Sequence, residues 1–313
     1  MSEERNVPDE LDGERLDRAV VKLFGGSRAI VRRAVDDGHV RINGRRSAKG
    51  SVVKAGDKVS VEQSIVPEDG PPVPNPELPL QVMYESDAVL VVNKPAHMAT
   101  APLRPDETNT LANALIAQYP ELIGIGYRPR EPGLLHRLDN DTSGLVVVAR
   151  TTTAFDELAN ALKGDRIHKE YLVICTRSGL PEMGSIEHPI CHHPKDRRRM
   201  YACVHPRDVA RNAPKPASTA YQVEREAGDL ALVRVSASRA ARHQIRVHFA
   251  SIEHPLVGDE LYDGDLTRGM TRQALHAARV SYESRTPGMS FDVSSALPTD
   301  MTDLLATPTP SAS

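Results

Sequence analysis

The feature that most constrains the fold is the stretch QSIVPEDGPPVPNPELPL, residues 63–80. It holds six prolines and one glycine, which can neither continue a helix nor lie in the centre of a sheet, so it predicts a semi-extended linker. The linker divides a small domain, residues 1–62, from a large domain, residues 81–301, and residues 302–313 are expected to form a disordered tail.

The bulk properties predict a protein of the cytoplasm. The apolar runs fall short of the roughly 18 residues that a membrane helix needs, and the polar N-terminus MSEERNVPDELDGE is unlike a signal peptide. Three cysteines at irregular spacing are too few for a disulfide framework, which fits a reducing compartment. Nothing in the sequence requires an assembly larger than a monomer.

Charge is distributed unevenly along the chain. Between Arg15 and Lys58, twelve lysines and arginines face four acidic residues, a balance of +8, whereas the whole chain has a net charge of −3. The rest of the chain therefore carries about −11. A basic domain joined to an acidic one is typical of a nucleic-acid-binding protein, although a merely solvated face explains the same balance.

The small domain shows helical and then strand periodicity. Apolar residues with helical spacing start at Leu16, and a second helix, which Ser27 can cap, is predicted to stop at Gly38. The run HVRING predicts a short strand that enters an Asn43–Gly44 turn, and AGDKVSVE predicts a turn and another strand. Two helices and a small curled sheet make an α+β domain.

This domain resembles the alpha-L RNA-binding domain, a family named for a small-subunit ribosomal protein, through RLDRAVVKLFGGSRAIVRRAVDDGHVRINGR and VKAGDKVSV. In that family, basic residues on the helix face and before the strand contact RNA phosphates, and each such contact releases counterions. The resemblance gives this role to five arginines: Arg28, Arg32, Arg33, Arg41 and Arg45. The alternative is a small charged domain that binds a protein.

The large domain alternates predicted strands and helices. Strands are expected in AVLVVNKP, GLVVVAR, KEYLVICT and DLALVRVS, and a helix in TAFDELANALK. Neither GxGxxG nor GxxxxGK[ST] occurs, so dinucleotide and nucleoside-triphosphate chemistry lack their best sequence evidence. GxSxG and HExxH are missing as well.

Two polar clusters raise the question of ligands. Cysteines and histidines between Cys191 and His205 suggest zinc, but the spacing C-H-H-x9-C-x-H matches no usual zinc pattern and adjacent histidines point in different directions. We therefore expect no metal. The basic run KDRRRM, residues 195–200, is either a solvated loop or a surface loop that contacts phosphate.

The segment LLHRLDNDTSGL, residues 134–145, concentrates charge in a turn. Asn140, Asp141 and Thr142 have side chains that bond their own backbone, so we predict a structural role for them. Asp139 differs, because it follows Arg137 by two residues and a nearby cation keeps a carboxylate ionised and oriented. Such a carboxylate acts as a nucleophile or a general base, and the spacing does not choose between these roles.

The motif HRLDNDTSGLVVVAR resembles the signature of the RluA-type pseudouridine synthases. The resemblance extends through YESDAVLVVNKPA, TLANAL, KEYLV, HQIRVHFASIEHPLVGDELY and LHAARVSYE, over residues 81–300. It implies an α+β pseudouridine synthase fold with a mixed, mostly antiparallel central sheet and flanking helices. It also implies an isomerase that converts uridine to pseudouridine in structured RNA without a cofactor. By family association, large-subunit ribosomal RNA is the expected substrate and transfer RNA the alternative.

The resemblance implies roles for four residues. Asp139 corresponds to the aspartate that attacks the ribose or deprotonates it, and Arg246 of HQIR to the basic residue that pairs with it. Tyr171 of KEY corresponds to the tyrosine that stacks on the target base and moves a proton from its ring. Arg137 corresponds to the arginine inserted where the uridine is flipped out. Three of these roles have a plainer alternative. Tyr171 could be an aromatic residue of the core, Arg246 could form a surface ion pair, and Arg137 could pair with a neighbouring aspartate.

The sequence departs from the family pattern in two places. Residues 239–242 read RAAR where the family usually has Thr-Gly-Arg-Thr or similar before HQIR, and KPAHMATAP lacks the usual Gly and His after KP. Two other classes stay open. An RNA-binding ribosome-assembly factor with an inactive synthase domain is disfavoured by the intact catalytic positions. A glycosidase would need a second catalytic carboxylate and has no use for an alpha-L domain.

Overall fold

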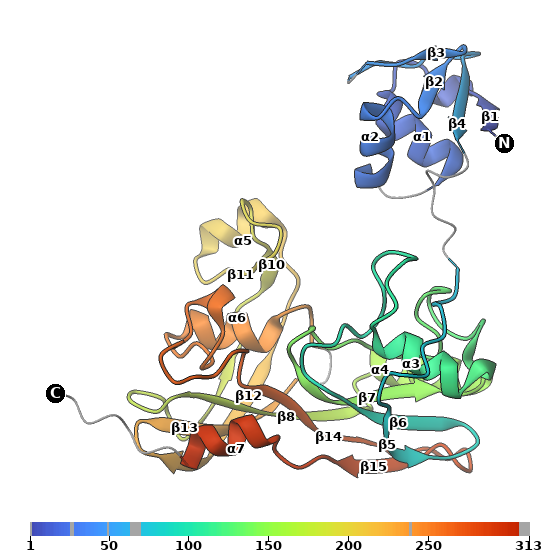
Figure 1. The fold of residues 1–313 in the computed structure, drawn as a ribbon. Helices are drawn as coiled ribbons and strands as arrows, with labels where there is room; N and C mark the ends of the chain where they lie inside the picture. Colours follow the sequence, from blue (N-terminus) through green and yellow to red (C-terminus); the bar gives the residue numbers. More distant parts are fainter. Residues whose placement is uncertain (1, 26–27, 49, 63–69, 238–239, 307–313) are drawn as a thin grey trace. The chain divides into compact units, whose positions relative to one another are not determined.

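The computed structural model describes residues 2–25, 28–48, 50–62, 70–237 and 240–306. The chain divides into two compact units, residues 1–69 and 70–313 (Figure 1). Each unit buries a hydrophobic core of its own. Among the helices of the described residues, none is long and apolar enough to span a membrane.

The small unit packs two helices on a four-stranded antiparallel sheet. Its elements are β1 (Ser2–Asn6), a 3-10 turn (Asp9–Leu11), α1 (Leu16–Phe24), α2 (Arg28–Asp36), β2 (Val40–Ile42), β3 (Arg45–Arg46) and β4 (Lys58–Glu62). The sheet has the order β1-β4-β2-β3. The predicted helices and strands are present, whereas the sequence pattern misses β1 because that edge strand is polar and exposed. The predicted cap Ser27 lies outside the described residues.

The core of the small unit explains its periodicity. Leu16, Ala19 and Val20 of α1 are buried against α2 and against the inward-facing valines of the sheet. The turn between β2 and β3 contains Asn43 and Gly44, both with positive φ, at 51° and 78°. A two-residue hairpin with this geometry matches the right-handed twist of its strands.

The large unit contains a nine-stranded sheet with helices on both faces and a separate two-stranded sheet formed by its sixth and seventh strands, β10 and β11. Its strands are β5 (Gln81–Glu85), β6 (Val89–Lys94), β7 (Ser143–Ala149), β8 (His168–Thr176), β9 (Met183–Ile186), β10 (Ile190–His192), β11 (Met200–Ala202), β12 (Thr219–Ala227), β13 (Leu230–Ser236), β14 (Leu275–Tyr282) and β15 (Phe291–Ser294). Its helices are α3 (Leu111–Gln118), α4 (Thr152–Lys163), α5 (Pro206–Asn212), α6 (Gln244–Ser251) and α7 (Thr299–Ala306), with 3-10 turns at Pro120–Leu122 and Glu260–Tyr262.

The sheet has the order β5-β6-β7-β14-β8-β13-β12-β9, with β15 paired to β14. Strands β7 and β14 run parallel, and the other neighbouring pairs among the described strands are antiparallel. This topology confirms the predicted α+β fold with a mixed, mostly antiparallel sheet. At Gly144 (φ 118°) a Cβ would lie 2.3 Å from the Ala277 carbonyl oxygen, so the close approach of β7 to β14 requires glycine.

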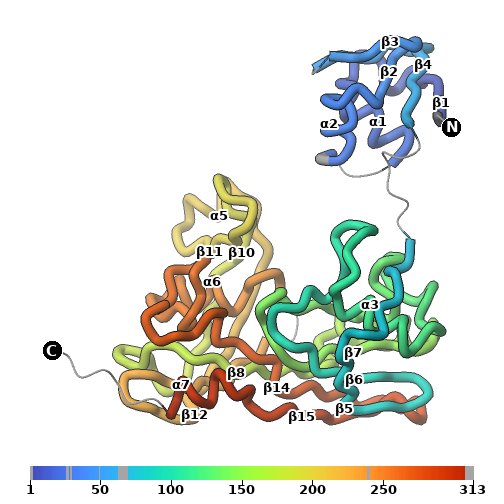
Figure 2. Tube along the Cα trace, in the orientation of Figure 1, coloured from blue at the N-terminus to red at the C-terminus, as the bar shows by residue number. Residues whose placement is uncertain are grey.

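Alternate side chains of the strands face opposite layers of helices. Val91 and Val147 pack on the side of α4, and Val92 and Val146 pack on the side of α3. In the other half of the sheet, α6 and α7 cover opposite faces. In Figure 1, α3 and α4 lie at the half that contains β5, β6 and β7, and α6 and α7 lie at the half that contains β8, β12 and β13. The loop after β6 and the hairpin β10–β11 rise from the same side of the sheet (Figure 2).

Both ends of the large unit extend beyond the predicted bounds. Residues 70–80 of the expected linker are anchored to this unit, because Asn75 donates hydrogen bonds to the carbonyls of Asn113 and Thr108. The tail expected from residue 302 is wrong as far as Ala306, because α7 buries Met301, Leu304 and Leu305 on one face of the helix. Residues 63–69 and 307–313 lie outside the described residues.

Candidate active site

Asp139 lies in an irregular segment that leads from Leu134 into β7. The Thr142 amide donates to the Asp139 carbonyl (3.1 Å), which closes the turn predicted for residues 140–142. On the other side of Asp139, the Thr100 hydroxyl lies 2.9 Å from the Leu138 carbonyl oxygen. The backbone of Asp139 is therefore held from both directions.

A buried lysine ties this segment to strand β6. Lys94 Nζ donates to the carbonyls of Pro95 (2.8 Å), Met98 (2.7 Å) and Asn140 (3.0 Å). Burial lowers the pKa of Lys94 to about 7, while the charges of Asp141 and Asp139 act in the opposite direction. Three carbonyl acceptors match the three N–H donors of an ammonium group, so Lys94 locks the turn that carries Asp139.

The Asp139 carboxylate pairs with an arginine from helix α6. Arg246 Nη1 donates to Asp139 Oδ2 (2.9 Å), and its Nε and Nη2 donate to the two carboxylate oxygens of Asp259, at 2.7 and 2.8 Å. The Asp259 side chain is fully buried, whereas that of Asp139 is 24% exposed. Arg246 is thus fixed by one buried carboxylate and presented to a second that solvent can reach.

The electrostatics of this triad favour a charged arginine. Burial opposes the charge of Arg246, but the hydrogen bonds and charges of Asp259 and Asp139 outweigh it and raise the pKa of Arg246. The guanidinium in turn donates a charge-assisted hydrogen bond to Asp139 at 2.9 Å. The pairing of Asp139 with Arg246, predicted from the family resemblance, is present in the structure.

His243 and Tyr262 complete the surroundings of Asp139. His243 Nε2 lies 3.7 Å from Asp139 Oδ2, and His243 Nδ1 lies 3.0 Å from the Tyr262 hydroxyl. The Arg246 guanidinium carbon lies 5.2 Å from the centre of the Tyr262 ring, a cation–π distance. The sequence analysis does not single out these two residues or Asp259, although all three lie in HQIRVHFASIEHPLVGDELY. Asp259 bonds Arg246, 13 residues away, and Tyr262 bonds His243, 19 residues away. These separations match neither helical nor strand periodicity, so spacing gives no signal for them.

Tyr171 lies in β8, opposite Val235 of β13 and Ala277 of β14. It is buried in the core cluster beneath α6. Burial, and then the negative charge of Asp139, raise the pKa of Tyr171 well above its ordinary value. Tyr171 is therefore electrostatically coupled to Asp139 and carries a hydroxyl that stays protonated near neutral pH.

Arg137 occupies a different position from the other predicted residues. Its side chain is 59% exposed, and Nη1 donates to Glu131 Oε1 at 3.2 Å. Its partner is thus a glutamate rather than the neighbouring aspartate considered in the sequence analysis. The remaining surface of the guanidinium faces solvent, where an RNA base or phosphate has access.

The five arginines predicted to bind RNA lie on α2, β2 and β3 of the small unit. Arg28, Arg32, Arg33 and Arg45 are exposed, and Arg41 is half-buried. Within the described residues, none of the five forms an ion pair with a carboxylate. Their cations are thus available to phosphate groups.

The cysteine and histidine cluster is centred on the hairpin β10–β11. The Cys191 and Cys203 sulfurs lie 3.6 Å apart and are buried, whereas His192 and His205 are exposed. The basic run 195–200 forms the tip of the same hairpin, where Arg198 pairs with Asp196. Arg242, at the departure from the family pattern, donates to the carbonyls of Arg197 and Arg198; Arg239 lies outside the described residues.

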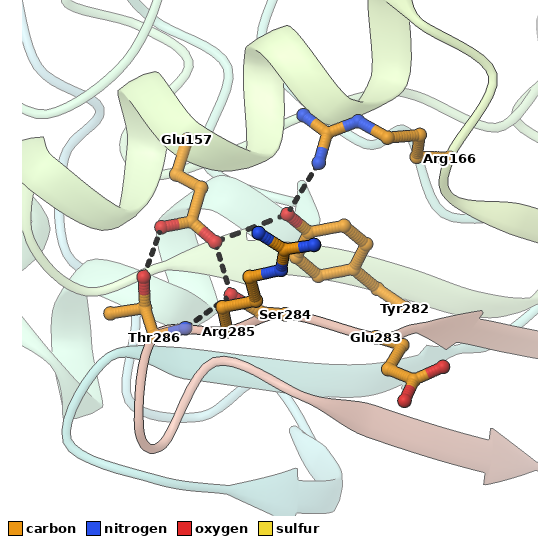
Figure 3. Close-up of a pocket in the computed structure, with 7 residues that line it drawn as sticks. All are labelled: Glu157, Arg166, Tyr282, Glu283, Ser284, Arg285 and Thr286. Carbon is orange, nitrogen blue, oxygen red and sulfur yellow. Dashed lines mark hydrogen bonds between the residues drawn. The ribbon is translucent and has the colours of Figure 1, made fainter.

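A hollow at another edge of the large unit is lined by residues of α4 and the β14–β15 connection (Figure 3). Its polar groups bond one another, since Glu157 accepts from the hydroxyls of Tyr282 (3.1 Å) and Thr286 (2.8 Å) and Arg166 donates to Tyr282. None of the predicted site residues lines it. We assign it a structural role in joining α4 to β14.

Comparison with known proteins places this fold and site in a family. The sequence matches the RNA pseudouridylate synthase family over residues 88–251 and the S4 domain over residues 14–59. The chain therefore belongs to the RNA pseudouridylate synthase family, which confirms both resemblances noted in the sequence. It is an RNA pseudouridine synthase with an N-terminal S4 RNA-binding domain.

Curated relatives cover almost the whole chain. It is 34% identical over 307 residues to the ribosomal large subunit pseudouridine synthase D of Yersinia pestis, across 94% of this chain and 90% of that protein. The protein of the same name from Xanthomonas campestris pv. campestris is 34% identical over 96% of this chain and 90% of its own length. The solved structure of human RNA pseudouridylate synthase domain containing 1 superposes with a TM-score of 0.52 at 25% identity, over 74% of this chain and 97% of that one.

Proposed function

We propose that this enzyme isomerises uridine to pseudouridine in large-subunit ribosomal RNA and that Asp139 carries the chemistry. The observation that supports the role of Asp139 most strongly is its ion pair with Arg246, which is itself fixed by the buried Asp259. The substrate assignment rests on relatives of more than 30% identity that are named large subunit synthases. The cytoplasmic location and the monomeric state expected from the sequence stay predictions.

The reaction requires the bond between ribose C1′ and uracil N1 to break and a bond between C1′ and uracil C5 to form. Asp139, held as an anion, either attacks C1′ or removes a ribose proton to open an elimination route. The freed uracil turns so that C5 faces C1′, and the proton on C5 leaves after the new bond has formed. Arg246 orients the carboxylate in either route through their hydrogen bond.

Tyr171 is proposed to stack on the base and to accept the proton from C5 late in the reaction. While Asp139 is an anion, burial and the charge of Asp139 both raise the pKa of Tyr171. Formation of the C1′–C5 bond returns Asp139 to a carboxylate in either route. The Tyr171 oxygen accepts the C5 proton as its own hydroxyl proton passes to solvent or to that carboxylate, so the phenol is restored at the end of the reaction.

Arg137 is proposed to enter the space that the target uridine leaves in the RNA. A base within a helix must be extruded before a carboxylate reaches its sugar, and an unfilled gap in the stack costs unstacking energy. The exposed guanidinium of Arg137, tethered on one side to Glu131, suits this task.

The substrate assignment is tested by mapping pseudouridines in ribosomal and transfer RNA from cells with and without this protein. We expect one or more positions of large-subunit ribosomal RNA to revert to uridine in cells that lack it. Loss confined to transfer RNA would overturn the substrate, and an unchanged map in both RNAs would favour the assembly factor with an inactive synthase domain.

The role of the small unit is tested by removing its exposed cations. The triple variant Arg28→Gln, Arg32→Gln, Arg33→Gln is expected to weaken RNA binding and to reduce the slope of log K against log salt by about 2 to 3, roughly one for each phosphate that is no longer neutralised. Replacement of Arg15, Arg18 and Lys22, which pair with Asp17 and Glu14, removes the same charge from the same unit and serves as the control. Equal effects of both triples would refute a specific phosphate-binding face.

A further inference from the structure

A chain of polar contacts joins Asp139 to the basic hairpin. The Met200 amide of β11 donates to the Tyr262 hydroxyl (2.8 Å), which lies 3.0 Å from His243 Nδ1. His243 Nε2 then faces Asp139 Oδ2 at 3.7 Å. The Met200 amide, Tyr262 and His243 have no part in the reaction steps above, although the His243 side chain is only 9% exposed and the Tyr262 residue only 3%.

The contacts of His243 favour one tautomer, because its Nε2 faces a carboxylate. The Tyr262 oxygen already accepts from the Met200 amide, so its own proton is available for His243 Nδ1. When Nδ1 accepts, the proton of a neutral imidazole must be on Nε2, where it points to a carboxylate. The opposite tautomer would set the Nε2 lone pair against Asp139 and leave the Tyr262 proton without this acceptor.

The charge states of the two rings permit this arrangement. Burial lowers the pKa of His243 to about 4, with the charge of Asp139 opposing and those of Arg246 and Arg242 reinforcing the shift. Burial raises the pKa of Tyr262 to about 12. At neutral pH the pair is therefore a neutral phenol beside a neutral imidazole, and which nitrogen holds the proton matters.

The backbone of His243 has a constrained conformation. Its φ of 55° and ψ of 15° place it in the left-handed region, immediately before the first residue of α6. A residue other than glycine in this region is energetically unfavourable and persists where its surroundings over-determine it. The imidazole ring of His243 and the ring of Tyr262 form an edge-to-face contact, with 5.8 Å between centroids and 87° between planes. Tyr262 thus contacts His243 both through its ring and through the hydrogen bond to Nδ1.

We propose that His243 is a positioning residue that presents an Nε2–H to Asp139, and that the basic hairpin sets this tautomer through Tyr262. The proposal rests on the proposed role of Asp139. At 3.7 Å the contact is longer than a hydrogen bond, and catalytic contacts of this kind often tighten when substrate binds. His243 and Arg246 then contact the same oxygen of Asp139, so that the other oxygen is directed to the sugar.

The hairpin is the part of the large unit best suited to sense RNA near this site. Its tip carries Lys195, Arg197, Arg198 and Arg199, and Arg199 lies 5.3 Å from the centre of the Tyr262 ring. Arg242, next to His243, donates to two carbonyls of the same tip. Phosphate bound at the tip therefore lies near Arg199, which precedes Met200, and near Arg242, which precedes His243. Met200 and His243 both belong to the chain of contacts that orients Asp139.

The first test replaces the tyrosine hydroxyl. Tyr262→Phe is expected to lower the single-turnover rate constant on large-subunit ribosomal RNA about tenfold, which corresponds to the loss of one hydrogen bond between neutral groups. The RNA dissociation constant should stay within about twofold. Tyr282→Phe is the matched control, because it removes another buried hydroxyl that makes two hydrogen bonds (Figure 3). Equal rates for the two variants, or a loss confined to RNA affinity, would overturn the proposal.

The second test asks whether the tyrosine acts through the histidine. In His243→Gln the side-chain amide supplies a donor that does not depend on a tautomer, so we expect this variant to retain most of the rate. Adding Tyr262→Phe to His243→Gln should then cost less than twofold. A further tenfold loss in the double variant would show that Tyr262 acts independently of His243 and would refute the inference.

The tautomer itself can be read without RNA. In the full-length protein labelled with ¹⁵N histidine, the His243 ring, assigned by its absence from His243→Gln, should show a protonated Nε2 and an unprotonated Nδ1 at pH 7. A protonated Nδ1 would overturn the inference whatever the activity of the protein. This measurement also remains decisive if Tyr262→Phe does not fold, or if Asp139 is not the catalytic group.

Discussion

Asp259 offers the sharpest test of how the site is held together. Its carboxylate is fully buried and accepts from Nε and Nη2 of Arg246 at 2.7 and 2.8 Å. The change Asp259→Asn keeps the shape of the side chain but replaces one acceptor oxygen by an NH₂ group, which faces an N–H of Arg246. One charge-assisted hydrogen bond is lost, and the buried arginine keeps Asp139 as its only carboxylate among the described residues.

The magnitude follows from these contacts. A hydrogen bond to a charged group contributes about 1.5–3 kcal/mol, and complete loss of one partner of a buried pair costs about 3–5 kcal/mol. Because Arg246 keeps Asp139 and one oxygen of the new amide, we expect a loss of about 2–3 kcal/mol. For a unit of this size, that corresponds to a fall in Tm of roughly 4–12 °C. The rate of pseudouridine formation should fall about tenfold or more, since Arg246 is no longer locked beside Asp139.

The matched control is Asp292→Asn. Asp292 also binds an arginine, Arg279, through two hydrogen bonds, but the side chains are 57% and 42% exposed. Exposed pairs of this kind contribute little to stability, so thermal unfolding and activity should match those of the unchanged protein. If calorimetry finds equal Tm values for the two variants, or if Asp259→Asn keeps full activity, the buried pair does not position Arg246.

Two further perturbations test the supports around Asp139. Lys94→Met removes the donor of the buried Met98 carbonyl and of the part-buried Pro95 and Asn140 carbonyls. It should lower the free energy of unfolding by about 3 kcal/mol, at about 1 kcal/mol for each group. Urea denaturation beside the exposed Lys163→Met measures this loss, and equal midpoints would contradict it. For His276, burial lowers the folded pKa to about 4, below the ordinary value of about 6.5. Between these values the unfolded chain binds more protons, so stability falls as pH is lowered through this window, by up to about 1.4 kcal/mol per pH unit. His276→Gln should flatten that slope, and an unchanged slope would show that His276 does not contribute to it.

Local patterns predicted the elements of this protein because local forces decide them. The helix at Leu16 and the strand that ends at Lys94 carry their periodicity in neighbouring residues. Strand β1 escaped prediction because an edge strand needs only backbone partners, which β4 supplies over fifty residues away. Helix α7 escaped because its apolar face is stabilised only against strands distant in the chain.

The same distinction separates the residues of the site. The motif around Asp139 predicted a reactive carboxylate there, and the resemblance predicted its pairing with Arg246, which the structure contains. Spacing gave no hint that Asp259 is the second partner of Arg246, or that Arg137 pairs with Glu131 rather than with an aspartate beside it. These pairings depend on how the loop after α6 folds back on that helix and on how the segment before β7 is bent, neither of which follows a regular spacing.

The central claim is tested most directly by pseudouridine formation in Asp139→Asn. With large-subunit ribosomal RNA from cells that lack the protein, the unchanged enzyme should form pseudouridine, and Asp139→Asn should bind this RNA with affinity within about twofold but form none. Asp141→Asn, two residues further on, changes an exposed carboxylate that bonds His97 and should remain active. Pseudouridine formation by Asp139→Asn at the rate of the unchanged enzyme would contradict the account.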